Sequence, residues 1–485
     1  MQAEETTARL LKDLQVEKRA NKMAGVLATK VAITRKGKSH MDSQAGLLRQ
    51  LRNKNLSLDE QAELRCQLVK HYEDTGQHEA AREAMGELWQ RVGERPNVEG
   101  LERRTAAEVL LRAGVLTGWL GTCYQIEGAQ ETARNLITES LTIFQSFKHG
   151  KKIAEAEAEL ARCYFKEGRY DEARVILGDA LSRLQTDSEL KALVILRMAV
   201  VEWGAARHNE ALRILTEAAP LFEKVNKQVI KGSYHNHLAM IFQTLAEAGQ
   251  REYLDRAFIE YTAASFHFEE AGHKHYLANV ENNLGLLYFT AHRYKEAHRH
   301  LDYARLLMVS LKNREGAAQV DETKARVFLT EGRNAEAEKA ARYAVRVLEK
   351  NEHYALAEAL ITHGRAQARL GRKEHARLTL YRALEISEQS GALARAGEAA
   401  LCIVRELGGR LEEVQILSEK LPLVKELRRY EHDLVKQALI RAQGSVTQAA
   451  RLLRTSHQHL AYLVEHKHKD LLPLRKPPIR RPKSK

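Results

Sequence analysis

The sequence is poor in residues that interrupt or crosslink a chain. Only 7 prolines occur among 485 residues, which favours long helices because proline breaks the helical hydrogen-bond ladder. The four cysteines, Cys66, Cys123, Cys163 and Cys402, include no close pair. Neither a zinc ligand set nor a disulfide framework is therefore predicted, and a reducing compartment is favoured.

Long apolar runs are missing as well. No stretch approaches the length of a membrane-spanning helix, and the N-terminus carries Glu4 and Glu5 without the apolar core of a signal peptide. We therefore expect a cytoplasmic protein, associated with the nucleoid if it binds DNA. The 44% hydrophobic and 29% charged residues are typical of a globular chain long enough for two or more domains.

Sequence motifs for catalysis are absent too. The chain contains no GxxxxGK[ST], GxGxxG, GxSxG or HExxH, which removes the usual signals for phosphate loops, dinucleotide sites, serine hydrolases and zinc proteases. Neighbouring histidines such as His298 and His300 are two residues apart, so on a helix they point away from each other and make poor metal pairs. We expect no enzymatic activity, no cofactor and no bound metal.

The net charge of +13 is concentrated at the ends of the chain. Residues 425–485 contain 15 Lys and Arg against 5 Asp and Glu, and residues 1–60 contain 12 against 7. The remaining middle contains 50 against 52 and is nearly neutral. A basic C-terminal end indicates a polyanionic partner, most simply nucleic acid.

A pattern with a period near 40 residues dominates the middle of the chain. It consists of a small residue, an aromatic three positions later, a glycine-like turn residue four after that, and an alanine five further on. The alanine lets two helices cross closely, the aromatic fills the space beside them, and the glycine makes the turn. The clearest copies are Gly121, Tyr124, Gly128 and Ala133; Ala161, Tyr164, Gly168 and Ala173; Gly285, Tyr288, His292 and Ala297; Ala325, Phe328, Gly332 and Ala337; and Gly364, Gln367, Gly371 and Ala376.

This pattern resembles the tetratricopeptide repeat. Weaker copies place their alanines at Ala81, Ala211 and Ala257, which gives about eight copies over residues 57–405. The resemblance implies an all-α, right-handed superhelix of helical hairpins that binds a protein or peptide partner on its concave side.

Five residues are candidates for contacting that partner. Asn236 and Asn282 each lie three positions before the small residue of their copy, and a side-chain amide can bind a peptide backbone through its donor and acceptor together. Gln243, Phe289 and Arg326 are expected on the same side. The alternative is that all five are ordinary solvated or inter-repeat residues.

Residues 444–464 predict two short helices around a tight corner. Ser445 can cap the first helix and Ser456 the second, while Leu453, Leu460 and Val464 fall on one buried side. Amide, imidazole and phenol groups on the outward side suit base edges in a major groove, and the basic residues around them suit phosphates. The predicted DNA-contacting residues are Ser445, Gln448, Arg451, Ser456, His457, Gln458, His459, Tyr462, Lys467, Lys469, Arg475, Lys476, Arg480 and Arg481.

This segment resembles the Fis-type helix-turn-helix of bacterial regulators. The leading helix at 430–442, the turn at Gly444, the pair Ala449 and Ala450, and the serine opening the second helix carry the resemblance. The family usually has glycine at the corner, where this chain has Arg454, at a cost on the order of 1 kcal/mol. The resemblance implies binding to double-stranded DNA and a homodimer formed through the leading helix.

The predicted organisation has five parts. They are a basic helical arm or cap at 1–56, the repeat array at 57–405, a closing helix and linker at 406–424, the helix-turn-helix at 425–470 and a basic tail at 471–485. Two functions remain open at this point. The first is a sequence-specific transcriptional regulator whose array binds a protein partner. The second is an interaction scaffold whose C-terminus only dimerises or binds polyanions without reading sequence.

Overall fold

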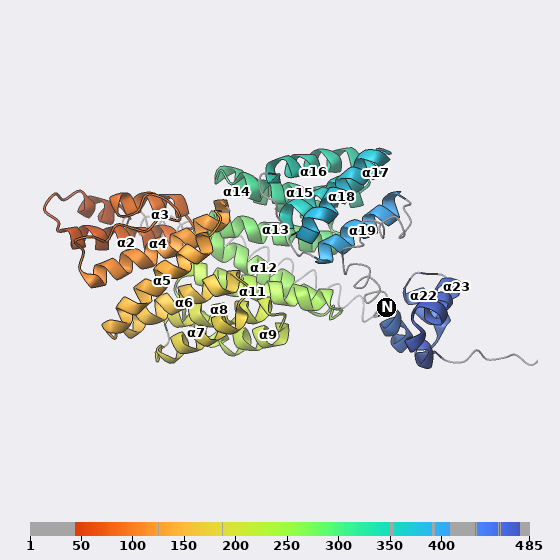
Figure 1. The fold of residues 1–485 in the computed structure, drawn as a ribbon, viewed down its shortest axis with the longest axis horizontal. Coiled ribbons are helices and arrows are strands. Elements are labelled where there is room, and N and C mark those ends of the chain that lie inside the picture. Colours follow the sequence, from red (N-terminus) through yellow and green to blue (C-terminus); the bar gives the residue numbers. More distant parts are fainter. Residues whose placement is uncertain are drawn as a thin grey trace, which may run out of the picture. The chain divides into compact units, whose positions relative to one another are not determined.

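The computed structural model describes residues 44–475 except 125, 187, 350–353, 390–392, 408–431, 433, 454 and 456. Residues 1–43 of the predicted arm and residues 408–424 of the predicted closing helix and linker therefore lie outside the described residues. The chain divides into two compact units, Met1–Val320 and Asp321–Lys485 (Figure 1). No helix in the described part of the chain is both long and apolar enough to cross a membrane.

The first unit consists of consecutive antiparallel helix pairs. Helices α11 and α12 lie side by side (Figure 1), and in each of the other pairs the two helices also contact each other. The pairs are α2 (Leu58–Asp74) with α3 (His78–Met85), α4 (Arg103–Tyr124) with α5 (Ala129–Ser146), α6 (Gly150–Lys166) with α7 (Tyr170–Ser182), α8 (Glu189–Gly204) with α9 (His208–Glu217), α11 (Gln228–Glu247) with α12 (Tyr253–Glu270), and α13 (Lys274–Thr290) with α14 (Tyr294–Ser310). Two short helices, η1 (Gly86–Leu88) and α10 (Ala219–Lys224), lie between pairs.

The same hairpin arrangement continues through the second unit. Leu329, Ala337 and Ala366 form one core cluster across three successive helices. These helices belong to a series that starts with α15 (Arg314–Thr330), which begins before the unit boundary, and continues with α16 (Asn334–Leu348), α17 (Tyr354–Arg369), α18 (Lys373–Gln389) and α19 (Leu393–Leu407). The prediction of an all-α array of helical hairpins is confirmed.

Side-chain size explains why the hairpins form. The eight alanines predicted on second helices all have no exposed surface: they are Ala81, Ala133, Ala173, Ala211, Ala257, Ala297, Ala337 and Ala376. Opposite Ala297, a Cβ added to Gly285 would lie 2.7 Å from Cδ2 of Leu301. Protein interiors are close-packed, so a larger residue at either position would force the two helices apart.

The turns between paired helices require a left-handed residue. Gly168 has φ +74°, as expected for a glycine predicted at a turn. His292 has φ +58° at the equivalent position of another pair, where the spacing predicted a turn although the residue is not glycine. A left-handed conformation is uncommon for residues with a side chain, although histidine is among those that tolerate it best.

An arginine directly after the turn was missed in the sequence. Arg293 stacks on the ring of Tyr288 at 4.7 Å and forms an ion pair with Glu296. The same arrangement recurs at two other turns, with Arg169 on Tyr164 beside Glu172 and with Arg333 on Phe328 beside Glu336. Its sequence signal is an arginine after the turn residue with glutamate three positions later. The arginine and the glutamate together cover the half-buried aromatic residue that lies four positions before the turn residue.

A separate small core holds the C-terminal helices. Residues 434–441 are helical and are followed by α22 (Val446–Leu452) and α23 (His457–Tyr462). Leu460 and Val464 are fully buried in this core and Leu453 is partly buried, as the spacing predicts. The predicted second helix is α-helical only to Tyr462, because the chain then widens into a π-helical turn, η2 (Leu463–Lys467), followed by η3 (Lys469–Leu474).

Candidate functional site

The candidate binding surface of the first unit is the side formed by α2, α4, α6, α8, α11 and α13, which we call the first-helix wall. Successive members contact one another from α2 to α11. In arrays of helical hairpins, the first helices of the pairs line the concave side. Partner-binding residues are therefore sought among the side chains on this wall.

Two predicted asparagines lie on neighbouring members of the wall. Asn236 is on α11, and its Nδ2 lies 3.5 Å from Sδ of Met240, a weak acceptor. Asn282 is on α13, and its Oδ1 is buried without a hydrogen-bond partner among the described residues. Both amides therefore keep hydrogen-bonding capacity that the described part of the chain does not use.

The other predicted wall residues are differently placed. Gln243 accepts a 3.0 Å hydrogen bond from the hydroxyl of Tyr261 and donates a 2.9 Å bond to Glu247, so its amide is held within the fold. Phe289 is partly buried, with its ring 6.3 Å from that of Tyr294. Arg326 lies on α15 in the second unit, where burial raises the pKa of Glu322 and the charge of Arg326 opposes that rise.

A buried arginine in the wall was not predicted. Arg112 on α4 is 3% exposed and lies 2.8 Å from Glu73, 2.6 Å from Glu155 and 3.3 Å from Glu108. Burial raises the pKa of Glu73 to about 7, although Arg112 acts in the opposite direction. The only sequence signal is one arginine within the apolar stretch TAAEVLLRAGVL. This cluster fixes α2, α4 and α6 relative to one another.

A second charged cluster follows along the same wall. Arg162 on α6 and Arg197 on α8 share one carboxylate, Glu159, at 3.1 and 2.6 Å. Arg162 also lies over the ring of Trp119 at 5.5 Å. Burial raises the pKa of Glu159, but the two guanidiniums outweigh it, so the net shift is downward. The carboxylate stays ionised at neutral pH between the two cations.

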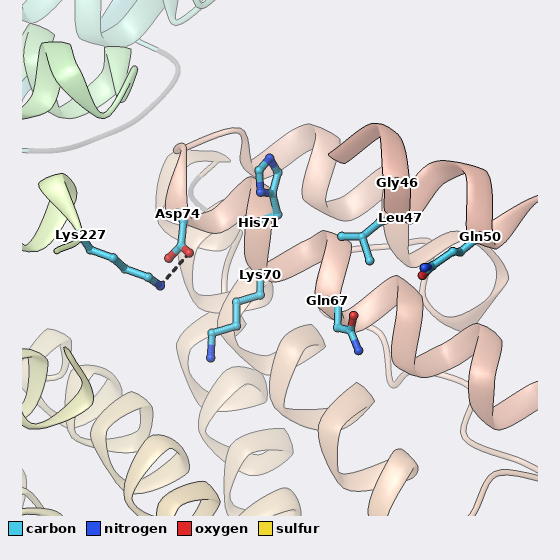
Figure 2. A pocket seen from close by; sticks show the side chains of 8 residues that line it. All are labelled: Gly46, Leu47, Gln50, Gln67, Lys70, His71, Asp74 and Lys227. Atoms are coloured by element: carbon cyan, nitrogen blue, oxygen red, sulfur yellow. Dashed lines mark hydrogen bonds and ion pairs between the residues drawn. The ribbon is translucent and has the colours of Figure 1, made fainter. Parts of the chain in front are cut away.

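The edge of the wall carries an open cavity of about 440 Å³. Gln67, Lys70, His71 and Asp74 of α2 line one side, and Lys227 reaches across from the residue before α11 (Figure 2). Lys70 is 2.6 Å from Glu155, and Lys227 is 2.9 Å from Asp74. The cavity thus lies where the start of the array meets a segment far along the chain.

The C-terminal helices carry several of the predicted DNA-contacting residues on their surface. Ser445 caps α22 and accepts a hydrogen bond from the backbone N–H of Gln448. The exposed side chains are Gln448, Arg451, His457, Gln458 and Lys469. Arg475 instead forms an ion pair with Glu465. The predicted contacts Ser456, Lys476, Arg480 and Arg481, and the side chains of His459, Tyr462 and Lys467, lie outside what the structure describes.

Comparison with known proteins identifies the class of the array. A family model described as tetratricopeptide repeat matches residues 145–195, which include all of α6 and α7. The chain is a tetratricopeptide repeat protein. No significant match was found among curated proteins.

Several solved structures are similar to this chain. One is a Signal Transduction ATPase with Numerous Domains protein with a tetratricopeptide repeat sensor from Pyrococcus horikoshii, 14% identical, covering 72% of this chain and 56% of that chain with a TM-score of 0.50. It supports the array fold alone. BtubC from P. vanneervenii is 15% identical, covering 50% of this chain and 91% of its own, with a TM-score of 0.36. The apo form of RapI is 11% identical, covering 74% and 99%, with a TM-score of 0.46.

Proposed function

We propose that this protein is a non-enzymatic adaptor that binds a protein or peptide partner along its first-helix wall. The observation that carries the proposal is the amide of Asn282, whose Oδ1 is buried without a partner among the described residues. A buried acceptor without a hydrogen bond costs roughly 1–3 kcal/mol, so a shift of the half-buried Asn282 side chain that brings Oδ1 to a donor of a bound partner would be favourable.

The neighbouring asparagine extends the proposed contact. Asn236 occupies the register of Asn282 one pair earlier, and its only described contact is the weak one to the sulfur of Met240. An extended peptide presents alternating backbone donors and acceptors, which two side-chain amides can bind without reading its side chains. Sequence preference in the partner would then come from the neighbouring aromatic and charged residues of the wall, such as Phe289.

Affinity capture from cells with matched variants tests this proposal. The double substitution of Asn236 and Asn282 by alanine should lower the affinity for bound partners about thirtyfold, because two hydrogen bonds of roughly 1 kcal/mol each are lost. Val175→Ala is the control, since Val175 is 64% exposed on α7, a second helix. The proposal would be refuted if the unmodified chain, the double asparagine variant and Val175→Ala all recovered the same partners at the same levels.

We further propose that the C-terminal helices bind double-stranded DNA. Exposed His457 and Gln458 at the start of α23, with Arg451 and Lys469 nearby in sequence, support this proposal. The amide and imidazole groups suit base edges, and the cations suit phosphates. The resemblance to the Fis-type helix-turn-helix suggests the same and adds a homodimer. The alternative is a C-terminus that dimerises or binds polyanions without sequence preference.

Selection of bound fragments from random duplex DNA with the full chain separates these two possibilities. Enrichment of one sequence supports base recognition by α23. Binding without enrichment, or no binding at low salt, leaves the protein as an interaction scaffold, because only the repeat array would then recognise a partner.

A further inference from the structure

The turn between α2 and α3 meets two segments that lie far along the chain. Asp74, the last residue of α2, forms an ion pair with Lys227, which directly precedes α11. Gly76, in the turn itself, lies against the imidazole of His273, which directly precedes α13. The first helix pair therefore contacts the starts of two later first helices within the same unit.

The contact at Gly76 leaves no room for a side chain. A Cβ added to Gly76 would lie 2.6 Å from Nε2 of His273, well inside van der Waals distance. The imidazole cannot move aside easily, because it is buried, its Nδ1 accepts a hydrogen bond from the backbone N–H of Tyr276, and its ring stacks on that of Tyr276 at 3.9 Å.

A row of rings continues this contact into the wall. The ring of His78, at the start of α3, lies 4.7 Å from Trp119 of α4, and Trp119 lies 6.2 Å from Tyr276 of α13. Burial lowers the pKa of His78 to about 4 and that of His273 to about 3. Both imidazoles are therefore neutral at physiological pH, which suits aromatic stacking between α3, α4 and α13.

We propose that this contact is a releasable clasp, formed by Asp74, Gly76, Lys227 and His273, that holds the first unit closed across its first-helix wall. The inference rests on the proposed function, because the clasp limits access to the wall on which a partner would bind. Besides the row of rings, the contact consists of one ion pair and the packing of Gly76 on His273. Its ion pair is partly solvated, with 36% and 35% of the two side chains exposed, and such pairs contribute little stability. Opening it leaves the helix pairs themselves intact.

The chain contains a reporter for the opening. Cys123, at the end of α4, is the one partly exposed thiol of the four, while Cys66, Cys163 and Cys402 are buried. Burial raises the pKa of the Cys123 thiol, and Glu315 of α15, Lys166 of α6 and Glu79 of α3 are near enough to affect it. Separation of these helices would expose Cys123, lower its pKa and speed its reaction with a thiol reagent.

Two glycines provide a matched pair of variants. Gly76→Ala and Gly168→Ala both place a side chain at a left-handed turn residue, with φ +70° and +74°. Only the first meets a neighbour, since no atom of the described residues lies within 4 Å of a Cβ at Gly168. The strain of a left-handed alanine is thus common to both variants, and only Gly76→Ala presses on His273.

The experiment measures alkylation of Cys123 in the full chain by peptide mass spectrometry, with thermal melting to show that each variant is folded. The proposal expects Gly76→Ala to react about tenfold faster than Gly168→Ala, which corresponds to a shift of about 1.4 kcal/mol in the opening equilibrium. Lys227→Met should also raise the rate, because it removes the ion pair while leaving the backbone unstrained. Equal rates in Gly76→Ala, Gly168→Ala and the unmodified chain would overturn the clasp.

The readout separates this inference from the proposed function. Thiol reactivity requires no partner, so the clasp can be established even if the asparagine variants bind every partner normally. If the wall is the binding surface and the clasp limits access, Gly76→Ala should also capture more partner than Gly168→Ala. Faster alkylation without greater capture would retain the opening but reject its role in partner access.

Discussion

Nζ of Lys227 lies 2.9 Å from Oδ2 of Asp74, although 153 residues separate them in the chain. The pair joins the end of the first helix of the array to the residue that precedes α11 (Figure 2). Lys227 also lies 3.7 Å from Glu189 at the start of α8. One ammonium group thus connects three helix pairs at the edge of the wall that we propose as the binding surface.

The buried charge cluster predicts a large loss of stability when Arg112 is removed. Arg112→Met should lower the free energy of unfolding by about 3–5 kcal/mol, because Glu73, Glu108 and Glu155 would remain near one another without their central cation. Chemical denaturation measures the change. Arg213→Met is the control, since its ion pairs are exposed and should contribute less than about 1 kcal/mol. Similar losses in both variants would contradict this role of Arg112.

Two helical glycines should respond oppositely to alanine. Gly285→Ala should destabilise the chain by about 1–3 kcal/mol, because the new Cβ would meet Leu301. Gly178→Ala should stabilise it by roughly 0.5–1 kcal/mol, since in the described part of the chain no atom lies within 4 Å of the new Cβ and alanine favours a helix more than glycine does. Thermal melting of both variants measures the two changes. Stabilisation by both substitutions would mean that the two helices of this pair leave room for a Cβ at Gly285.

Acidification should weaken the first unit below about pH 6.5. His78 and His273 have folded-state pKa values of about 4 and about 3, so between pH 6.5 and 4 the unfolded chain binds protons that the folded chain does not. Stability therefore falls as pH falls, by up to about 1.4 kcal/mol per pH unit for each histidine. Glu73, whose pKa is raised to about 7, has the opposite effect on stability. Between pH 7 and the ordinary pKa of glutamate, the folded chain binds a proton at Glu73 that the unfolded chain does not, so stability rises as pH falls.

Thermal melting at pH 7, 6 and 5 measures this dependence, and His78→Gln should make it shallower because one of the titrating groups is removed. A midpoint that rises on acidification in the unmodified chain would show that Glu73 outweighs the histidines.

Substitutions at the C-terminus should separate base reading from charge. Gln458→Ala should weaken binding to a selected DNA sequence by about 1–3 kcal/mol while leaving random duplexes unaffected. Removal of residues 476–485 should weaken binding to all duplexes and reduce the salt dependence, since five phosphate-neutralising cations are lost. Gel shifts over a range of salt concentrations measure both effects. An equal loss on selected and random DNA for Gln458→Ala would argue against base reading.

Local steric rules made the hairpins predictable from the sequence. Ala173 and Ala297 are buried, and Gly168 and His292 are left-handed, because residue size and backbone conformation act within one helix pair. The position of Asn282 on a first helix followed from the same spacing.

Contacts between distant segments could not be predicted in this way. Asp74 meets Lys227, and Gly76 meets His273, only because the chain returns on itself after several helix pairs. The spacing that placed Gln243 on a first helix gave no sign that its amide bonds to Tyr261 and Glu247, because those partners lie on a neighbouring helix and a neighbouring turn. Periodicity gives the helix on which a residue lies and leaves its partners undetermined.

Site-specific photocrosslinking in cells tests most directly whether the first-helix wall binds a partner. A photoreactive amino acid in place of Asn282 should produce a discrete crosslinked protein, and the same amino acid in place of exposed Val175 on α7 should not. Identical crosslinked species from both positions, or crosslinks at Val175 alone, would contradict the account.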